Sequence, residues 1–153
     1  MAERKFVPGP DQTDYTNIRY APVVNTVVTN GGKVLLVQRS PDMRLYPGYW
    51  NGVSGFLDDN RSIEEKVTQE LGEELGIAPE SIESMQRGQV LLQEAPEYHK
   101  TWLVVPVLVR VSATDFELDW EAKTAKWYTP IEIKGLDLLP GYGAVIGQFL
   151  DVL

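Results

Sequence analysis

Short runs of β-branched and apolar residues alternate along the chain with segments rich in glycine and proline. Residues 23–29 and 34–39 are two such runs, and they flank an Asn-Gly-Gly-Lys segment at 30–33. Glycines at this place supply the positive φ angles that a tight hairpin turn needs, so the pattern predicts a β-hairpin. Similar runs predict further strands at 88–93, 102–111 and 125–129.

Two prolines in the second half of the chain bear on its expected elements. Pro106 lies inside the 102–111 strand and predicts an edge position or a bulge, because proline has no N–H group for a neighbouring strand. Pro130 predicts the start of a short helix. Residues 144–152 predict a C-terminal helix with one apolar face, formed by Val145, Ile146, Phe149 and Leu150.

Irregular segments separate these elements. Residues 40–59 carry prolines and glycines among aromatic side chains, and a loop of this length indicates function. Residues 1–22 hold prolines with little periodicity, which predicts an irregular arm ahead of a single domain at 23–153. Strands on both sides of a central helix are typical of a mixed α/β domain.

The strongest helical pattern covers residues 63–75. Ser62 and Glu65 stand at the spacing of a capping box, and Gly76 followed by Pro79 marks the end of the helix. At about 100° per residue, one apolar stripe forms. This stripe consists of Ile63, Val67, Leu71 and Leu75.

Two glutamates of this helix do not follow the amphipathic pattern. The same rotation of about 100° per residue places Glu74 inside the apolar stripe and Glu70 at its edge, with Glu73 adjacent. Two carboxylates about 4 Å apart repel by about 4 kcal/mol at an effective dielectric constant near 20. A divalent cation would reverse this repulsion, so the pattern indicates a metal site with oxygen ligands. The other nearby acids are expected on solvated faces: Asp58, Asp59, Glu64, Glu65 and Glu80.

Composition narrows the choice of chemistry. The 153 residues include no cysteine and a single histidine, His99, which excludes disulfides, thiolate sites and histidine-rich zinc sites. His99 is expected in a loop or on the surface. The net charge of −8 should repel nucleic acid polymers. No apolar run approaches the roughly 20 residues of a membrane span, and the start resembles no signal peptide, so a cytoplasmic protein is expected.

Residues 55–77 resemble the motif of Nudix hydrolases, which reads Gly, five residues, Glu, seven residues, Arg-Glu-apolar-x-Glu-Glu-x-Gly-apolar. The spacing from Gly55 to Ile77 matches without insertion. The preceding hairpin, Trp50, and Glu121 followed by Trp127 are also similar to the family. The resemblance implies an α/β/α sandwich with a central mixed β-sheet.

The resemblance also implies hydrolysis of a diphosphate linkage in a nucleoside diphosphate derivative, with Mg²⁺ or Mn²⁺. By position, Glu70, Glu73 and Glu74 match the metal-binding glutamates, and the main chain at Ser54 matches the loop that completes the metal shell. Glu70 is the first candidate for the base and Glu73 the second, and Arg39 is a candidate phosphate contact. A further ligand stays open among Glu94, Glu97 and Glu121, as does the oligomeric state, a homodimer included.

Two positions depart from the motif: Arg61 replaces its first glutamate and Gln69 replaces its arginine. Arg61 is available to pair with a late glutamate, and Gln69 can hydrogen-bond a carboxylate but lacks the arginine charge. These departures keep open a catalytically weak or inactive binding module of the same fold. A diphosphate isomerase-like enzyme is a more remote alternative, because such chemistry relies on a cysteine that this chain lacks.

Overall fold

The predicted hairpin forms the middle of the sheet. The computed structural model describes residues 7–153, so the first six residues of the expected arm lie outside the description. Strands β1 (Tyr20–Asn30) and β2 (Lys33–Arg39) pair antiparallel around a turn whose Gly31 and Gly32 have φ angles of 58° and 78°. The hairpin is therefore confirmed, with β1 beginning three residues earlier than the sequence predicts.

One mixed sheet carries eight strands. Its main path runs β3-β2-β1-β7-β5, with β4 paired to β1, β6 to β7 and β8 to β2. The β1 and β7 strands are parallel and the other pairs antiparallel, which makes the sheet mixed. The remaining strands are β3 (Trp50–Asn51), β4 (Ser54–Phe56), β5 (Ile82–Arg87), β6 (Leu91–Ala95), β7 (Lys100–Val111) and β8 (Ala122–Tyr128).

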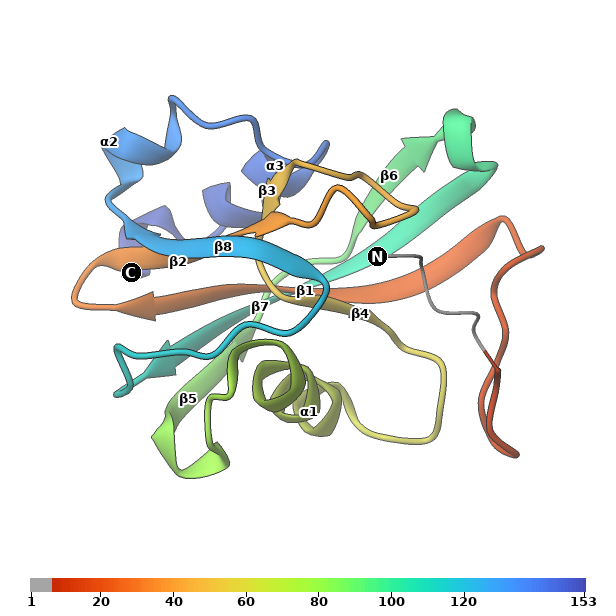
Figure 1. The fold of residues 1–153 in the computed structure, drawn as a ribbon, viewed down its shortest axis with the longest axis horizontal. Coiled ribbons are helices and arrows are strands. Elements are labelled where there is room, and N and C mark those ends of the chain that lie inside the picture. The colour runs from red at the N-terminus through yellow and green to blue at the C-terminus, as the bar shows by residue number, and fades with distance from the viewer. Residues whose placement is uncertain (1–6) are drawn as a thin grey trace.

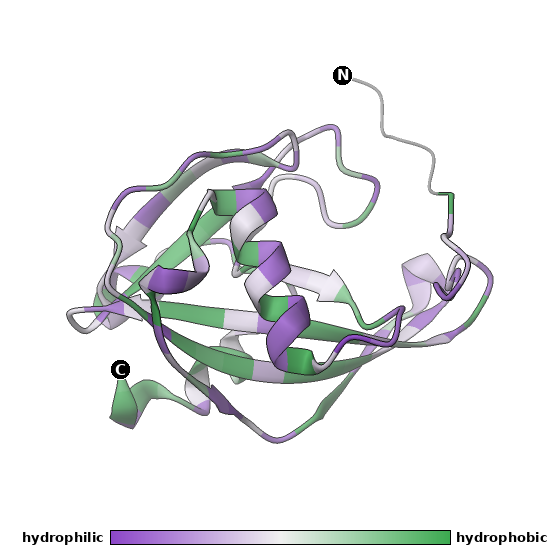
Figure 2. Cartoon of the chain, turned by 90° about the horizontal axis from the view of Figure 1, so that it is seen from below, coloured by the Kyte–Doolittle hydropathy of each residue, from purple (hydrophilic) through white to green (hydrophobic). Residues whose placement is uncertain are grey.

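Helices cover both faces of this sheet (Figure 1). Helix α1 (Ile63–Leu75) packs on one face, and α2 (Pro130–Ile133) and α3 (Tyr142–Gly147) lie on the other. Each face carries its own hydrophobic cluster, and the α1 cluster includes the predicted stripe residues Val67, Leu71 and Leu75. Seen from the α1 side, hydrophilic and hydrophobic residues alternate along the helix above mostly hydrophobic strands (Figure 2). The α/β/α sandwich is confirmed.

Both ends of α1 form as the sequence predicts. The Ser62 side chain accepts from the Glu65 backbone, the Glu65 side chain accepts from the Ser62 backbone, and Gly76 ends the helix at φ 64°. A second capping box, between Thr129 and Glu132, starts α2 at Pro130.

Several expected boundaries differ. The 40–59 segment includes β3 and β4, and the expected strand at 88–93 is replaced by β5 and β6 on either side of a break. The expected C-terminal helix is instead α3 followed by a 3₁₀ turn at Leu150–Val152. Leu150 is 49% exposed, so its assignment to the buried face is wrong. The chain leaves the helical path after Gly147, and this break turns Leu150 outward.

Pro106 lies in an interior strand, which contradicts the predicted edge position or bulge. It stands in β7, opposite Asn25 of β1 on one side. On the other side β6 pairs with β7 only up to Val104, and β5 pairs from Val107 onward. The gap between β6 and β5 accommodates a residue without an N–H group, and the Pro106 carbonyl there accepts from the Gly88 N–H at 2.8 Å.

Two smaller points complete the fold. His99 is exposed, as expected, and occupies a left-handed turn with φ 55° before β7. Within residues 7–153 none of the helices has the length and hydropathy that a membrane crossing requires.

Candidate active site

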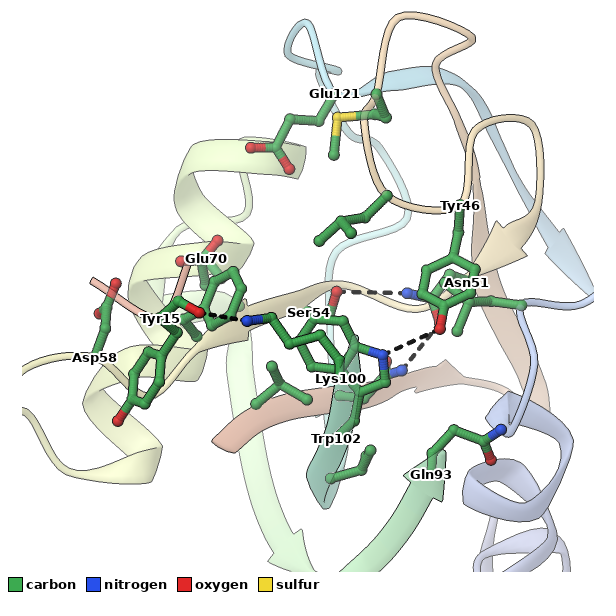
Figure 3. A pocket seen from close by; sticks show the side chains of 18 of the residues that line it. Tyr15, Tyr46, Asn51, Ser54, Asp58, Glu70, Gln93, Lys100, Trp102 and Glu121 are labelled. Carbon is green, nitrogen blue, oxygen red and sulfur yellow. Dashed lines mark hydrogen bonds between the residues drawn. The ribbon is translucent and has the colours of Figure 1, made fainter. Parts of the chain in front are cut away.

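A cavity of about 670 Å³ lies beside the middle of α1, and residues of β1, β4, β7 and α3 also line it. Figure 3 shows that Glu70 and Asp58 lie at one side of this cavity, and Tyr46 and Asn51 at the other. Four of the predicted site residues line the cavity, namely Arg39, Ser54, Glu70 and Glu73. The structure therefore brings residues from β2, β4 and α1 to one hollow.

Glu70 lies directly against strand β4. A Cβ atom built on Gly55 would stand 2.8 Å from the Glu70 carboxyl carbon and 2.8 Å from its Oε1. Only a glycine lets the carboxyl approach the backbone this closely. The Glu70 side chain is 14% exposed and lines the cavity, so its carboxyl is positioned by the strand while still facing the hollow.

Burial raises the pKa of the Glu70 carboxyl to about 7, and the nearby carboxylates of Glu73 and Glu121 act in the same direction. The Lys66 ammonium, 3.6 Å from Glu70 Oε1, opposes this rise. A carboxyl with this pKa is divided between its charged and neutral forms near neutral pH.

Glu74 occupies the buried stripe, as the helical rotation predicts, and is 7% exposed. Burial raises the pKa of its carboxyl well above the usual value, and a hydrogen bond with Glu121 together with the charges of Glu121, Glu70 and Asp119 raises it further. Glu74 is not among the described residues that line the cavity, whereas Glu121 is. Glu121, the hydrogen-bond partner of Glu74, therefore lies between the buried helix stripe and the cavity lining.

The other candidate acidic ligands differ in position. Glu94 accepts from the Thr101 hydroxyl at 2.9 Å and pairs with Arg19 at 3.4 Å. Neither Glu94 nor Glu97 belongs to the described cavity lining. The structure thus brings Glu121, of the three open candidates, to the glutamates of α1.

The two residues that depart from the motif, Gln69 and Arg61, make different contacts in the structure. Gln69 Nε2 donates to Glu73 Oε1 at 2.8 Å, which is the amide-to-carboxylate contact that the sequence suggested. Arg61 instead pairs with Asp59 at 3.6 Å, so the suggested pairing of Arg61 with a late glutamate is wrong. Arg61 precedes the helix and lines a separate surface hollow with Glu64, Thr68 and Gln69.

Lys66 and Asp58 were not recognised as site residues from the sequence. Lys66 Nζ lies 3.2 Å from Asp58 Oδ1 and 3.6 Å from Glu70 Oε1, and both Lys66 and Asp58 are 7% exposed. Gln12 Nε2 also donates to Asp58 Oδ2, at 2.9 Å. The assignment of Asp58 to a solvated face is therefore wrong, because Lys66 and Gln12 satisfy its buried carboxylate. The i, i+4 spacing of Lys66 and Glu70 was the available sequence signal.

Arg39 is anchored at the end of β2. Its Nε donates to the Leu45 carbonyl at 3.0 Å, and burial lowers the pKa of its guanidinium, while the Glu74 and Glu121 carboxylates oppose this change. Ser54 Oγ accepts weakly from Asn51 Nδ2 at 3.4 Å. Arg39 therefore places positive charge in the same wall as the acidic groups.

The opposite wall of the cavity is built from amides and aromatic rings. Asn25 Nδ2 donates to Asn51 Oδ1 at 3.0 Å, and Trp102 Nε1 donates to the Tyr46 hydroxyl at 3.0 Å. Asn25 is 6% exposed, and within the described chain its Oδ1 has no hydrogen-bond partner. This wall offers flat apolar surface with few polar groups, which is typical of a small-molecule site.

The N-terminal arm closes one rim of the cavity. Lys100 Nζ donates to the backbone carbonyls of Tyr15, Thr16 and Ile18, at 3.2 Å for Thr16. The Tyr15 ring stacks on Phe56 with a centroid separation of 5.9 Å. Figure 3 shows the Lys100 side chain reaching toward Tyr15 across the hollow.

The donor set near Glu70 suits a hard divalent cation. Carboxylate oxygens are the ligands that Mg²⁺ and Mn²⁺ prefer. Burial, with neighbouring carboxylates, raises the pKa of Glu70 and Glu74, and a bound cation would favour their charged forms. Within residues 7–153, no group of three or more His, Asp or Glu side chains is already arranged to hold a metal ion. Lys66 supplies part of the positive charge that this acidic cluster requires.

The protein is an α/β/α sandwich in which an acidic helix lies beside a cavity. A family model described as NUDIX domain matches residues 19–149, which is most of the chain. The protein therefore belongs to the Nudix family, as the motif at 55–77 indicates.

Curated relatives match over a shorter stretch. The mitochondrial NAD(P)H pyrophosphatase NUDT13 of Mus musculus is 38% identical over 63 residues, covering 41% of this chain and 17% of that protein. The NAD-capped RNA hydrolase NudC of Pseudomonas aeruginosa is 37% identical over 65 residues, covering 42% of this chain and 22% of that protein. The matched region is thus about a fifth of each relative.

Solved structures match over most of the fold. A MutT Nudix hydrolase from Burkholderia pseudomallei superposes with a TM-score of 0.74 at 18% identity, covering 85% of this chain and 98% of that one. The Nudix domain of Shewanella oneidensis NrtR, complexed with ADP ribose, gives 0.72 at 20% identity, with 86% and 87% coverage. These likenesses establish the sandwich architecture.

Proposed function

We propose that this protein is a metal-dependent hydrolase that cleaves a diphosphate linkage in a nucleoside diphosphate derivative. The observation that carries the proposal is the cavity of about 670 Å³, in which an acidic wall, formed by Glu70 and Glu73 of α1, faces a wall of amides and aromatic rings. The first wall suits diphosphate chemistry and the second suits a nucleoside. The volume lies within the range of small-molecule sites.

Glu70 is the proposed general base. Its carboxyl faces the cavity and has a pKa of about 7, and an effective base has a pKa near the working pH. The contact with Gly55 limits the positions that this carboxyl can adopt. Glu73, which lines the same wall and accepts from Gln69, is the second candidate.

The proposed cofactor is Mg²⁺ or Mn²⁺, held by Glu70, Glu73 and Glu74 with the main chain at Ser54, and with Glu121 as an additional ligand. When bound, such an ion supplies positive charge for the diphosphate oxygens and acidifies an attacking water. Arg39 contributes a fixed cation to the same wall and is the proposed phosphate contact.

The substrate is proposed to be a small molecule in the cytoplasm. The net charge of −8 disfavours a nucleic acid polymer, whereas a single diphosphate needs only a local cation. One similar protein is an NAD(P)H pyrophosphatase and one similar structure is complexed with ADP ribose, so dinucleotides and nucleoside diphosphate sugars are the first compounds to test.

The decisive experiment is a hydrolysis panel. Purified protein is incubated with NADH, ADP-ribose and other nucleoside diphosphate derivatives, with millimolar Mg²⁺, with Mn²⁺, or with a chelator, and the products are separated by chromatography. We expect metal-dependent release of a nucleoside monophosphate from at least one compound. No cleavage in the whole panel would contradict the proposal.

A binding module without turnover is the second candidate, and two contacts favour it. Gln69 holds Glu73, and Lys66 lies beside Glu70, so both candidate bases already have partners. Calorimetric binding of ADP-ribose without product formation in the panel would support this candidate in place of the enzyme.

A further inference from the structure

The acidic wall contains a buried cation that belongs to the protein itself. Lys66 lies on the first turns of α1, is 7% exposed at its side chain, and points its ammonium between two carboxylates. The distances are 3.2 Å to Asp58 Oδ1 and 3.6 Å to Glu70 Oε1. A buried lysine placed in this way needs both carboxylates to balance its charge.

Asp58 is in turn fixed by the N-terminal arm. Gln12 Nε2 donates to Asp58 Oδ2 at 2.9 Å, and the Thr13 N–H donates to the Asp58 carbonyl at 2.6 Å. Asp58 therefore holds Lys66 from one side, while the arm holds Asp58. Because Asp58 also holds the Lys66 ammonium, this ammonium cannot move freely with Glu70. Its contact with Glu70 therefore favours one position of the Glu70 carboxyl.

Arg61 and Gln69 stand where the family motif has a glutamate and an arginine, and in this structure both have other partners. Arg61 pairs with Asp59 at 3.6 Å, and Gln69 donates to Glu73 at 2.8 Å. Lys66 and Asp58 stand three residues before Gln69 and Arg61, respectively. The charge that supports Glu70 thus comes from a different pair of residues.

We propose that Lys66, balanced by Asp58, is the positioning residue for Glu70 and sets the affinity of the acidic wall for a divalent cation. The proposal rests on the proposed function for its effect on turnover, but its effect on metal affinity is independent of any substrate. Lys66 holds the Glu70 carboxyl against Gly55 and also repels an incoming cation. Asp58 has the opposite effect, because it draws the ammonium away from Glu70.

Two substitutions separate this role from a merely structural one. Lys66→Met keeps the length of the side chain and removes its charge. The affinity for Mn²⁺ should therefore rise by about tenfold, which is a binding free energy of about 1.4 kcal/mol. Asp58→Asn leaves the ammonium to Glu70 alone, so Mn²⁺ affinity should fall by about threefold or more. Damage to the fold would instead lower the affinity in both variants.

The experiment is calorimetric titration of the metal-free protein with Mn²⁺, with melting temperatures recorded for every variant. Lys126→Met, an exposed position on β8, is the matched control and should leave the affinity unchanged. Where Lys66→Met fails to fold, the double variant Asp58→Asn with Lys66→Met removes both charges. Because no ammonium then lies beside Glu70, its Mn²⁺ affinity should be higher than that of Asp58→Asn, and equal affinities of these two variants would contradict the role of Lys66. Shifts in the same direction for the two single variants, or no shift in either, would overturn the proposal.

Turnover at saturating Mn²⁺ provides a second readout. Lys66→Met should reduce kcat by about tenfold despite its tighter metal binding, and Lys66→Arg should restore most of it. An unchanged kcat in Lys66→Met would overturn the positioning role while the proposed function stands. A wild-type protein that binds Mn²⁺ but cleaves nothing would contradict the proposed function, and the opposite affinity shifts would still support the role of Lys66.

Discussion

Gly55 determines how closely the Glu70 carboxyl can approach strand β4. In Gly55→Ala the new methyl group would stand 2.8 Å from the carboxyl carbon, so the end of the Glu70 side chain must move. Because a flexible side chain can give way, we expect the fold to persist while turnover falls by about one to two orders of magnitude. Steady-state kinetics at saturating metal, with circular dichroism for the fold, measure both effects.

Gly72 provides the matched control in the same motif. A Cβ atom there would meet nothing closer than the Ile77 carbonyl oxygen at 3.8 Å, and the residue is exposed in the middle of α1. Gly72→Ala should therefore raise the free energy of unfolding by about 0.5–1 kcal/mol without changing turnover. Equal losses of activity in the two alanine variants would contradict the proposed role of the Gly55 contact.

Individual residues differ in how far the sequence could place them. The rotation of a regular helix placed Glu74 in the buried stripe and Glu70 at its edge, and the structure agrees. Asp58 could not be placed in this way, because its burial depends on the loop before α1 folding back onto Lys66 and Gln12. Periodicity describes one element at a time and does not report contacts between a loop and a helix.

At the scale of elements, the N-terminal arm is attached to the sheet by Lys100. Its ammonium donates to three carbonyls of the arm, and hydrogen bonds to a charged group each contribute about 1.5–3 kcal/mol. In Lys100→Met we expect faster amide hydrogen exchange at residues 13–18 and a lower melting temperature. Lys126→Met serves as the exposed control. Unchanged exchange in the arm would contradict this attachment.

Elements with a local signal were predictable and the others were not. Helix α1 and the first hairpin have caps or turn glycines of their own, so their positions follow from short stretches of sequence. Strand β5 reads Ile-Glu-Ser-Met-Gln-Arg and lacks the apolar alternation of a half-buried strand. The place of Pro106 depends on the break between β6 and β5, which is a property of the assembled sheet.

At the scale of the whole molecule, the acidic wall links metal binding to stability. Glu74 is buried and Glu70 half-buried, and both have raised pKa values, so an ion that binds the folded state should stabilise it. At a metal concentration of about 100 times Kd the gain is about 2.7 kcal/mol. We expect millimolar Mn²⁺ to raise the melting temperature by several degrees. Absence of both a melting shift and a calorimetric signal would contradict a metal site.

The motif spacing was sufficient to predict the α/β/α sandwich, because residues 19–149 then follow one family architecture. It was not sufficient to predict the cavity, which is lined by residues from β1, β2, α1 and β7. The amide wall at Asn25 and Asn51 arises only when distant strands meet. Such a surface has no signature in any single segment.

The most direct test of the account is the rate of diphosphate hydrolysis as a function of Mn²⁺ concentration, for the wild type, Glu70→Gln and Glu64→Gln. Glu64 lies on the same helix but pairs with Arg87 at 2.7 Å on the exposed side. We expect a saturable, metal-dependent rate in the wild type, a similar curve for Glu64→Gln, and a loss of about 10²-fold or more for Glu70→Gln. Equal rates for the two variants, or hydrolysis that persists in the presence of a chelator, would contradict it.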